Sequence, residues 1–215
     1  FDYGFKNDSE RQDLSISSWS FKALKSAKEA GCIEKGLDTA IEKATGFLIE
    51  HTSGKNQFIY STRNNKTKTA KAKHTMRAAG TASLHSFGQV GHKELKDDFN
   101  LICTLDYDNL DWKNPPACSL YGWYFASQAI FHSGSSKWKS WYSKLQKELI
   151  TNQNTDGSWT YPGKSFSLTI KDGQSKIIYS TVLSCLALST PYRFPKDRVN
   201  AVYKVPTIKY ATLKV

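Results

Sequence analysis

The 215-residue sequence lacks the features that mark several large protein classes. It has no apolar run of about 18 residues, which a membrane-spanning helix requires. It has no Gly-x-Gly-x-x-Gly stretch and no complete Gly-x-x-x-x-Gly-Lys-Ser/Thr loop, so nothing predicts a nucleotide cofactor. The absence of a Gly-X-Y period and of a sustained heptad excludes collagen-like and coiled-coil chains. Its 6 Trp, 11 Tyr and 11 Phe also exclude a disordered chain.

Metal-binding patterns are missing as well. The chain has 4 cysteines, no two of which form Cys-x-x-Cys, and none of its 5 histidines is spaced to complete a zinc site. Cys32 and Cys185 stand in apolar helical context, which predicts small core residues. Cys103 and Cys118 leave a disulfide open, so cysteine usage does not decide the compartment. Because the metal-binding and nucleotide-binding patterns are missing, we expect no metal and no cofactor.

The chain is strongly basic. It carries 30 Lys+Arg against 19 Asp+Glu, for a formal net charge of +11. This excess raises the hypothesis of a nucleic-acid partner. The lysines are spread over the whole length, however, and the densest stretch, 66–73, alternates Lys with small residues and has no aromatic for base stacking. It is more typical of a solvated loop and helix start than of a nucleic-acid surface.

Four segments rich in Ala, Ser and Gly recur along the chain, and three of them stop at a glycine, the usual residue just past a helix. Each of the three is followed by a more polar amphipathic segment. Small residues let helix backbones approach closely, so we predict inner helices near 14–30, 74–87, 119–133 and 176–190. The polar partners predict outer helices near 35–51, 91–104 and 136–152.

Aromatic turns mark a period in these helix pairs. Tyr3, Tyr60, Trp112 and Trp159 are 57, 52 and 47 positions apart. A two-helix unit of about 50 residues is typical of an all-α solenoid or toroid. Residues 199–215 alternate apolar and polar side chains, which predicts an extended C-terminal arm. The predicted organisation is a repeat domain over 1–195 and an arm over 196–215, with an ordinary helical bundle as the alternative.

One stretch resembles the QW motif of squalene cyclases. That motif places an aromatic or Leu, then Gln four positions later, then Gly-x-Trp, and its places are filled here by Leu149, Gln153, Gly157 and Trp159. A degenerate version is formed by Phe47, His51, Gly54 and Phe58. In that family the motif ties neighbouring repeats together and does no chemistry, so we expect Gln153 to bond the turn backbone and Trp159 to be a packing residue.

Three further segments resemble bacterial proteins described as prenyltransferase and squalene oxidase repeat proteins; these are 13–28, 121–128 and 179–194. The resemblance implies an α/α toroid over about 1–195. A complete toroid has more helices than this chain predicts, which implies either a partial ring or a fragment of a longer one. The chain starts with Phe1 rather than Met, so we expect a leader or further repeats to precede it. The resemblance also implies a periplasmic or secreted location in a bacterium.

The catalytic motifs of these families are missing. Hopene-type cyclases use Asp-x-Asp-Asp as their acid, and the nearest stretch here, Asp106-Tyr107-Asp108-Asn109, lacks the last Asp. No segment offers the Asp, Cys and His that hold zinc in protein prenyltransferases. Asp13 and Asp108 are the weak catalytic candidates, and turn chemistry is the competing interpretation for Asp108.

Aromatic and polar residues gather where the inner helices begin. A concave face with aromatics and few polar groups suits a ligand. The ligand-binding candidates are Trp19, His74, Arg77, Tyr121, Tyr124, Gln128 and Tyr179. The competing interpretation is that these aromatics fill the middle of a ring of small-residue helices.

The predicted function is therefore a ligand- or protein-binding scaffold without cyclase activity. The alternative is an enzyme acting on a polyprenyl lipid or a glycan in the central cavity of a toroid. Either hypothesis leaves the ligand and the oligomeric state open.

Overall fold

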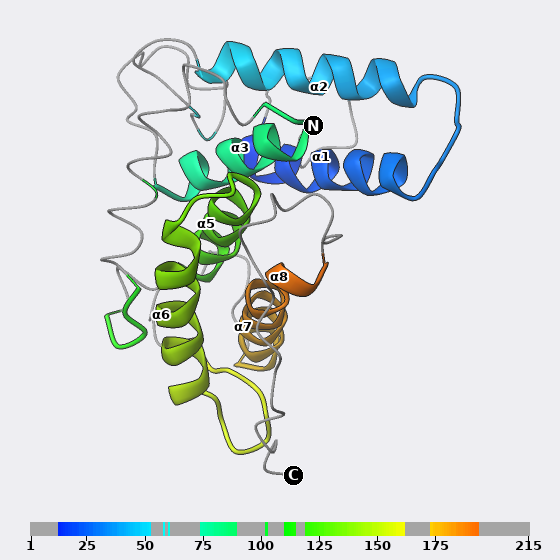
Figure 1. Cartoon of the computed structure of the whole chain (residues 1–215). Coiled ribbons are helices and arrows are strands. Elements are labelled where there is room, and N and C mark those ends of the chain that lie inside the picture. Colours follow the sequence, from blue (N-terminus) through cyan, green and yellow to red (C-terminus); the bar gives the residue numbers. More distant parts are fainter. Residues whose placement is uncertain are drawn as a thin grey trace, which may run out of the picture. The chain divides into compact units, whose positions relative to one another are not determined.

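The computed structural model describes residues 13–52, 58, 60, 74–89, 102, 110–114, 119–161 and 173–193 (Figure 1). The chain divides into two compact units, Phe1–Ile102 and Cys103–Val215. The described residues are mostly helical and include no strand, so the predicted all-α class is confirmed. None of the described helices is both long and apolar enough to cross a membrane.

The first unit contains three described helices. They are α1 (Leu14–Glu29), α2 (Leu37–Thr52) and α3 (His74–Ser86). The closest packing joins α1 to α3, and α2 lies against both. The helix positions predicted for this unit are confirmed to within two residues at each end.

The second unit contains four described helices. They are α5 (Leu120–His132), α6 (Lys137–Thr151), α7 (Gly173–Leu188) and the short α8 (Thr190–Arg193). Again the first and third helices, α5 and α7, pack most closely, while α6 contacts both. The predicted helices are confirmed to within three residues at each end. Pro191 does not continue α7 but stands in the first turn of α8, where its missing N–H costs nothing.

Glycines end the predicted inner helices as expected. Gly31, Gly88 and Gly134 have φ of +77°, +81° and +65°. This left-handed conformation favours glycine because it has no Cβ to clash. The sequence therefore fixes where α1, α3 and α5 stop.

Small residues are buried in α3 and α5. Ala78, Ala79 and Ala82 are fully buried in α3, and every residue of α5 from Gly122 to Phe131 is buried. Polar serines remain inside because they bond locally: the Ser127 hydroxyl donates to the Trp123 carbonyl and accepts from Trp141 Nε1 at 3.0 Å.

The cysteine prediction is wrong. Both Cys32 and Cys185 are exposed free thiols. Cys32 lies in the α1–α2 turn rather than in α1, just beyond Gly31. Cys185 lies on a face of α7 that also leaves Ile178 and Val182 exposed. Because α7 is apolar on all sides, its sequence does not show which side is covered.

The aromatic turn after α6 is built as expected. Gln153 Nε2 donates to the Gly157 carbonyl at 2.8 Å, and Trp159 is buried with its Nε1 donating to the Leu149 carbonyl at 2.8 Å. The Ser158 hydroxyl, followed by its backbone N–H, lowers the pKa of Asp156 below its ordinary value. The turn therefore closes on the end of α6 through its own hydrogen bonds.

The aromatic turn at 110–114 contacts α5 and α6 of the same unit. The Trp112 backbone N–H donates to Glu148 on α6 at 3.1 Å, and its ring lies 6.3 Å from that of Trp123 on α5. The predicted outer helix 91–104 (apart from Ile102), the C-terminal arm, Asp108, Cys103 and Cys118 lie outside the described residues.

Candidate ligand site

The predicted ligand residues are shared between the two units. Trp19 is exposed on α1 and Arg77 is half-buried on α3. The side chain of His74 lies outside the description. The other four, Tyr121, Tyr124, Gln128 and Tyr179, belong to the second unit, on α5 and α7. No single described site gathers them.

Two of these candidates are packing residues. Tyr124 and Gln128 are each 1% exposed. The Tyr124 ring lies 5.0 Å from that of Phe125, and its hydroxyl accepts from Arg193 of α8 at 3.4 Å. Tyr121 is half-buried beside the same phenylalanine, at 4.7 Å. The interpretation that these aromatics fill a helical core therefore holds for Tyr124.

Asp13 caps α1. Its side chain is fully buried, and Oδ1 accepts from the Ser15 N–H at 3.0 Å, the Ser15 hydroxyl at 2.6 Å and the Ile16 N–H at 3.4 Å. The N–H groups of Ser15 and Ile16 are among the first of the helix, and such groups have no partner inside it. This geometry is that of an N-cap, a structural role that accounts for the carboxylate.

Asp13→Asn is therefore expected to leave the free energy of unfolding within about 0.5 kcal/mol of the parent, because asparagine caps as well as aspartate. Asp13→Ala should lower it by about 0.5–2 kcal/mol. Chemical denaturation of both variants measures the difference. Two variants of equal stability would contradict the capping role.

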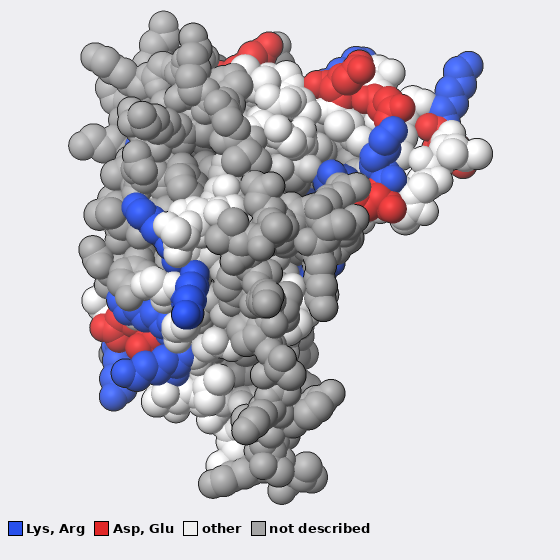
Figure 2. All heavy atoms as spheres, viewed as in Figure 1, with Lys and Arg blue, Asp and Glu red and all other residues white. Residues whose placement is uncertain are grey.

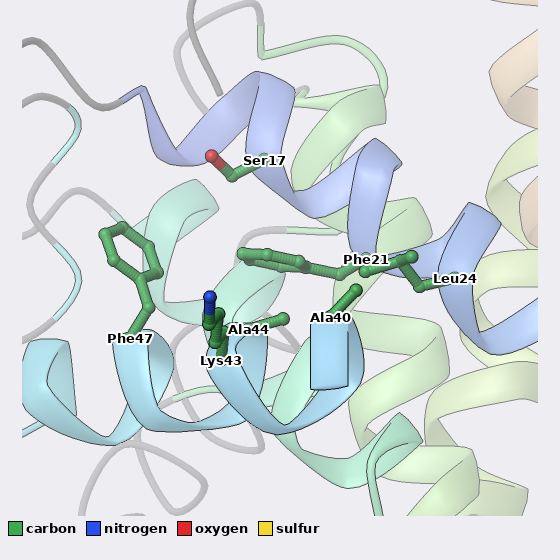
Figure 3. Close-up of a pocket in the computed structure, with 7 residues that line it drawn as sticks. All are labelled: Ser17, Phe21, Leu24, Ala40, Lys43, Ala44 and Phe47. Carbon is green, nitrogen blue, oxygen red and sulfur yellow. The ribbon is translucent and has the colours of Figure 1, made fainter. Parts of the chain in front are cut away.

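A cleft opens between α1 and α2 in the first unit (Figure 3). One wall is Ser17, Phe21 and Leu24 of α1, and the other is Ala40, Lys43, Ala44 and Phe47 of α2. Its volume is about 310 Å³, at the lower end of the range for small-ligand pockets, about 300–1,000 Å³. It is large enough for a small apolar molecule.

The register of the two helices forms this space. The α1 residues recur at i, i+4 and i+7, and the α2 residues at i, i+3, i+4 and i+7, so each set lies on one helix face. The two short side chains on α2, Ala40 and Ala44, leave room opposite the Phe21 ring. That ring has two aromatic neighbours, with its centroid 6.1 Å from that of Phe47 and 6.0 Å from that of Phe87. The walls are therefore fixed by aromatic packing.

Two polar groups stand at one end of the cleft. In the view of Figure 3, the Ser17 hydroxyl of α1 lies above the gap between the rings of Phe47 and Phe21, and the Lys43 ammonium of α2 lies below it. Leu24 and Ala40 line the other end. An ion pair between Lys28 and Asp38, at 2.6 Å, joins the two helices beyond that apolar end.

Sequence patterns did not point to this cleft. Ser17 belongs to the small-residue segment that predicts close packing, and Lys43 looks like any solvated lysine on an outer helix. A space between two helices depends on which faces meet, which no local pattern records.

The described residues show neither a metal site nor, in one view, a basic face. No group of three His, Cys, Asp or Glu side chains in the described ranges is placed to hold a metal ion. In Figure 2, basic and acidic side chains lie intermixed over the described part of the visible surface. The described geometry thus offers binding chemistry based on apolar contact with a small polar end.

Comparisons with protein-family models, curated proteins and solved structures find no match to the chain.

Proposed function

We propose that the chain is a ligand-binding domain built of stacked two-helix repeats, and that a small apolar molecule binds in the α1–α2 cleft. The cleft itself carries the proposal, because an apolar pocket of about 310 Å³ with two polar groups at one end is what a small ligand requires. The proposed fold is a partial α/α toroid related to squalene cyclases. Both units belong to the proposed repeat array.

Parallels between the two units support the repeat proposal. Phe58 lies against Gly80 of α3, 22 positions later, and the Trp159 N–H bonds Thr181 of α7, also 22 positions later. Leu48 and Leu149, near the ends of the preceding helices, are both fully buried. In each unit the first helix packs most closely on the third. Such correspondences are expected when one helix-pair plan recurs.

The enzyme alternative has less support. Asp13, its best carboxylate, is engaged by three hydrogen bonds as a helix cap and does not line the cleft. The cleft contributes a hydroxyl and an ammonium group but no carboxylate. Acid-catalysed cyclisation and glycoside hydrolysis both need a carboxylic acid at the substrate, so binding without turnover fits these walls better.

A neutral apolar fluorophore, N-phenyl-naphthylamine, tests this function. The wild-type protein is expected to bind it with a Kd of about micromolar. Ala44→Phe should weaken binding at least about tenfold, because Ala44 lines the cleft and the added ring would fill part of its volume. Ala40→Phe provides a second blocking variant if the first is poorly folded, as judged by circular dichroism.

Ala23→Phe is the matched control, since Ala23 is exposed on α1 and does not line the cleft. It should bind the fluorophore like wild type. No binding by the wild-type protein, or equal binding by folded Ala44→Phe and Ala40→Phe, would overturn the proposal.

A further inference from the structure

The cleft has distinct chemical ends. Its walls are apolar from Leu24 to the Phe21 ring, while Ser17 and Lys43 supply the polar groups that line it. Because α1 and α2 are joined by a short turn and run in opposite directions, the start of α1 faces the later part of α2. This register puts Ser17 beside residues 43–47 and Leu24 beside Ala40, in agreement with Figure 3.

The Ser17 hydroxyl is buried and has no hydrogen-bond partner among the described residues. Five serines on the predicted inner helices donate to the carbonyl four residues earlier, within 2.7–2.8 Å: Ser18, Ser83, Ser86, Ser127 and Ser180. Ser17 does not make this bond although its residue is only 1% exposed. A buried hydroxyl without a partner costs free energy, which a ligand acceptor in the cleft would recover.

Lys43 supplies the charge. Its ammonium group forms no ion pair with any described carboxylate, whereas Lys25 and Lys28 pair with Glu29 and Asp38. The cleft lining has no acidic residue to balance it. The complementary ligand group is therefore an anion that accepts hydrogen bonds from both a hydroxyl and an ammonium group.

We propose that the cleft binds a monomeric single-chain carboxylate, a fatty-acid-like amphiphile, with its head at Ser17 and Lys43 and its chain running toward Leu24. This inference rests on the proposed function and adds the chemical class of the ligand. The alkyl chain of the ligand makes apolar contact along Phe21 and Ala44, and its carboxylate accepts hydrogen bonds from the Ser17 hydroxyl and the Lys43 ammonium group. Lys43 stays at the cleft edge, where its charge needs no buried partner.

Displacement of the bound N-phenyl-naphthylamine measures the preference for the head group. Three ligands with the same chain are compared below their micelle concentrations: decanoate, decanol and decyltrimethylammonium. Decanoate should bind about tenfold more tightly than decanol, and the cation should bind most weakly. Added salt should narrow the difference, because the lysine is exposed and its charge is screened.

Variants separate the two donors from the apolar walls. Lys43→Met keeps the length and apolar stem of the side chain but removes the charge, so it should abolish the preference for decanoate over decanol. Ser17→Ala should reduce decanoate affinity severalfold. Lys139→Met, which removes an exposed lysine from α6, is the matched control and should behave like wild type.

The outcomes of these experiments distinguish the carboxylate inference from the proposed function on which it rests. Equal affinity for decanoate and decanol, or an unchanged preference in Lys43→Met, would overturn the carboxylate inference while fluorophore binding and its loss in Ala44→Phe still supported the cleft. Failure of the fluorophore to bind, or binding that Ala44→Phe and Ala40→Phe leave intact, would overturn both.

Discussion

Trp159→Ala is expected to lower the free energy of unfolding by about 3–5 kcal/mol, the usual effect of truncating a buried tryptophan. Trp159 is only 3% exposed, and its Nε1 donates to the Leu149 carbonyl. Truncation would leave a cavity at the end of α6 and remove the partner of that carbonyl. Since domains are stable by only about 5–15 kcal/mol, a drop in melting temperature of about 10 °C or more is expected.

Trp19→Ala is the matched control. Trp19 is 40% exposed on α1, so its loss should cost about 1 kcal/mol or less. Trp138, on α6, is by contrast 3% exposed, and its ring stacks on that of Tyr142 at 4.8 Å. We therefore expect its truncation to cost as much as that of Trp159. An unchanged melting midpoint for Trp159→Ala would contradict its structural role.

Gly80→Ala and Gly46→Ala are expected to change stability in opposite directions, although each adds one methyl group to a helix. At residue 80 a Cβ would overlap the ring of Phe58, which is fully buried against α3. Overfilling such a contact typically costs about 1–3 kcal/mol. At residue 46, an exposed position of α2, a Cβ would meet nothing within 4 Å. Alanine should therefore stabilise the helix there by about 0.5–1 kcal/mol.

Chemical denaturation of the two alanine variants measures both effects. The Phe58→Leu change should partly relieve Gly80→Ala, because the smaller side chain gives way, and the double variant should therefore be more stable than the sum of the single effects predicts. A Gly80→Ala protein at least as stable as the parent would show that Phe58 does not lie against this helix.

Helix positions could be predicted from the sequence because local features set them. Glycines at 31, 88 and 134 mark helix ends, and the spacing of Leu145 and Leu149 marks the buried face of α6. These features act within a few residues of each other. Such local features do not determine the packing partners of α7, because that helix is apolar all round. The exposure of Cys185 was therefore not foreseen.

The site could not be predicted in the same way. Predicted residues such as Tyr124 are aromatic and polar enough to suit a ligand, yet Tyr124 is packed inside the second unit. The cleft depends instead on two alanines facing a phenylalanine across a helix pair, and on a serine that does not bond its own helix. Only the meeting of α1 with α2 makes Ser17 and Lys43 neighbours of one space.

Titration with decanoate, followed by NMR of isotope-labelled alanine methyl groups, tests the central claim most directly. Ala40 and Ala44 line the cleft, whereas Ala126 and Ala129 are buried in the second unit. Saturable shifts of the Ala40 and Ala44 signals, with those of Ala126 and Ala129 unmoved, are the result that we predict. Shifts confined to the second unit, or no shift at saturating decanoate, would contradict it.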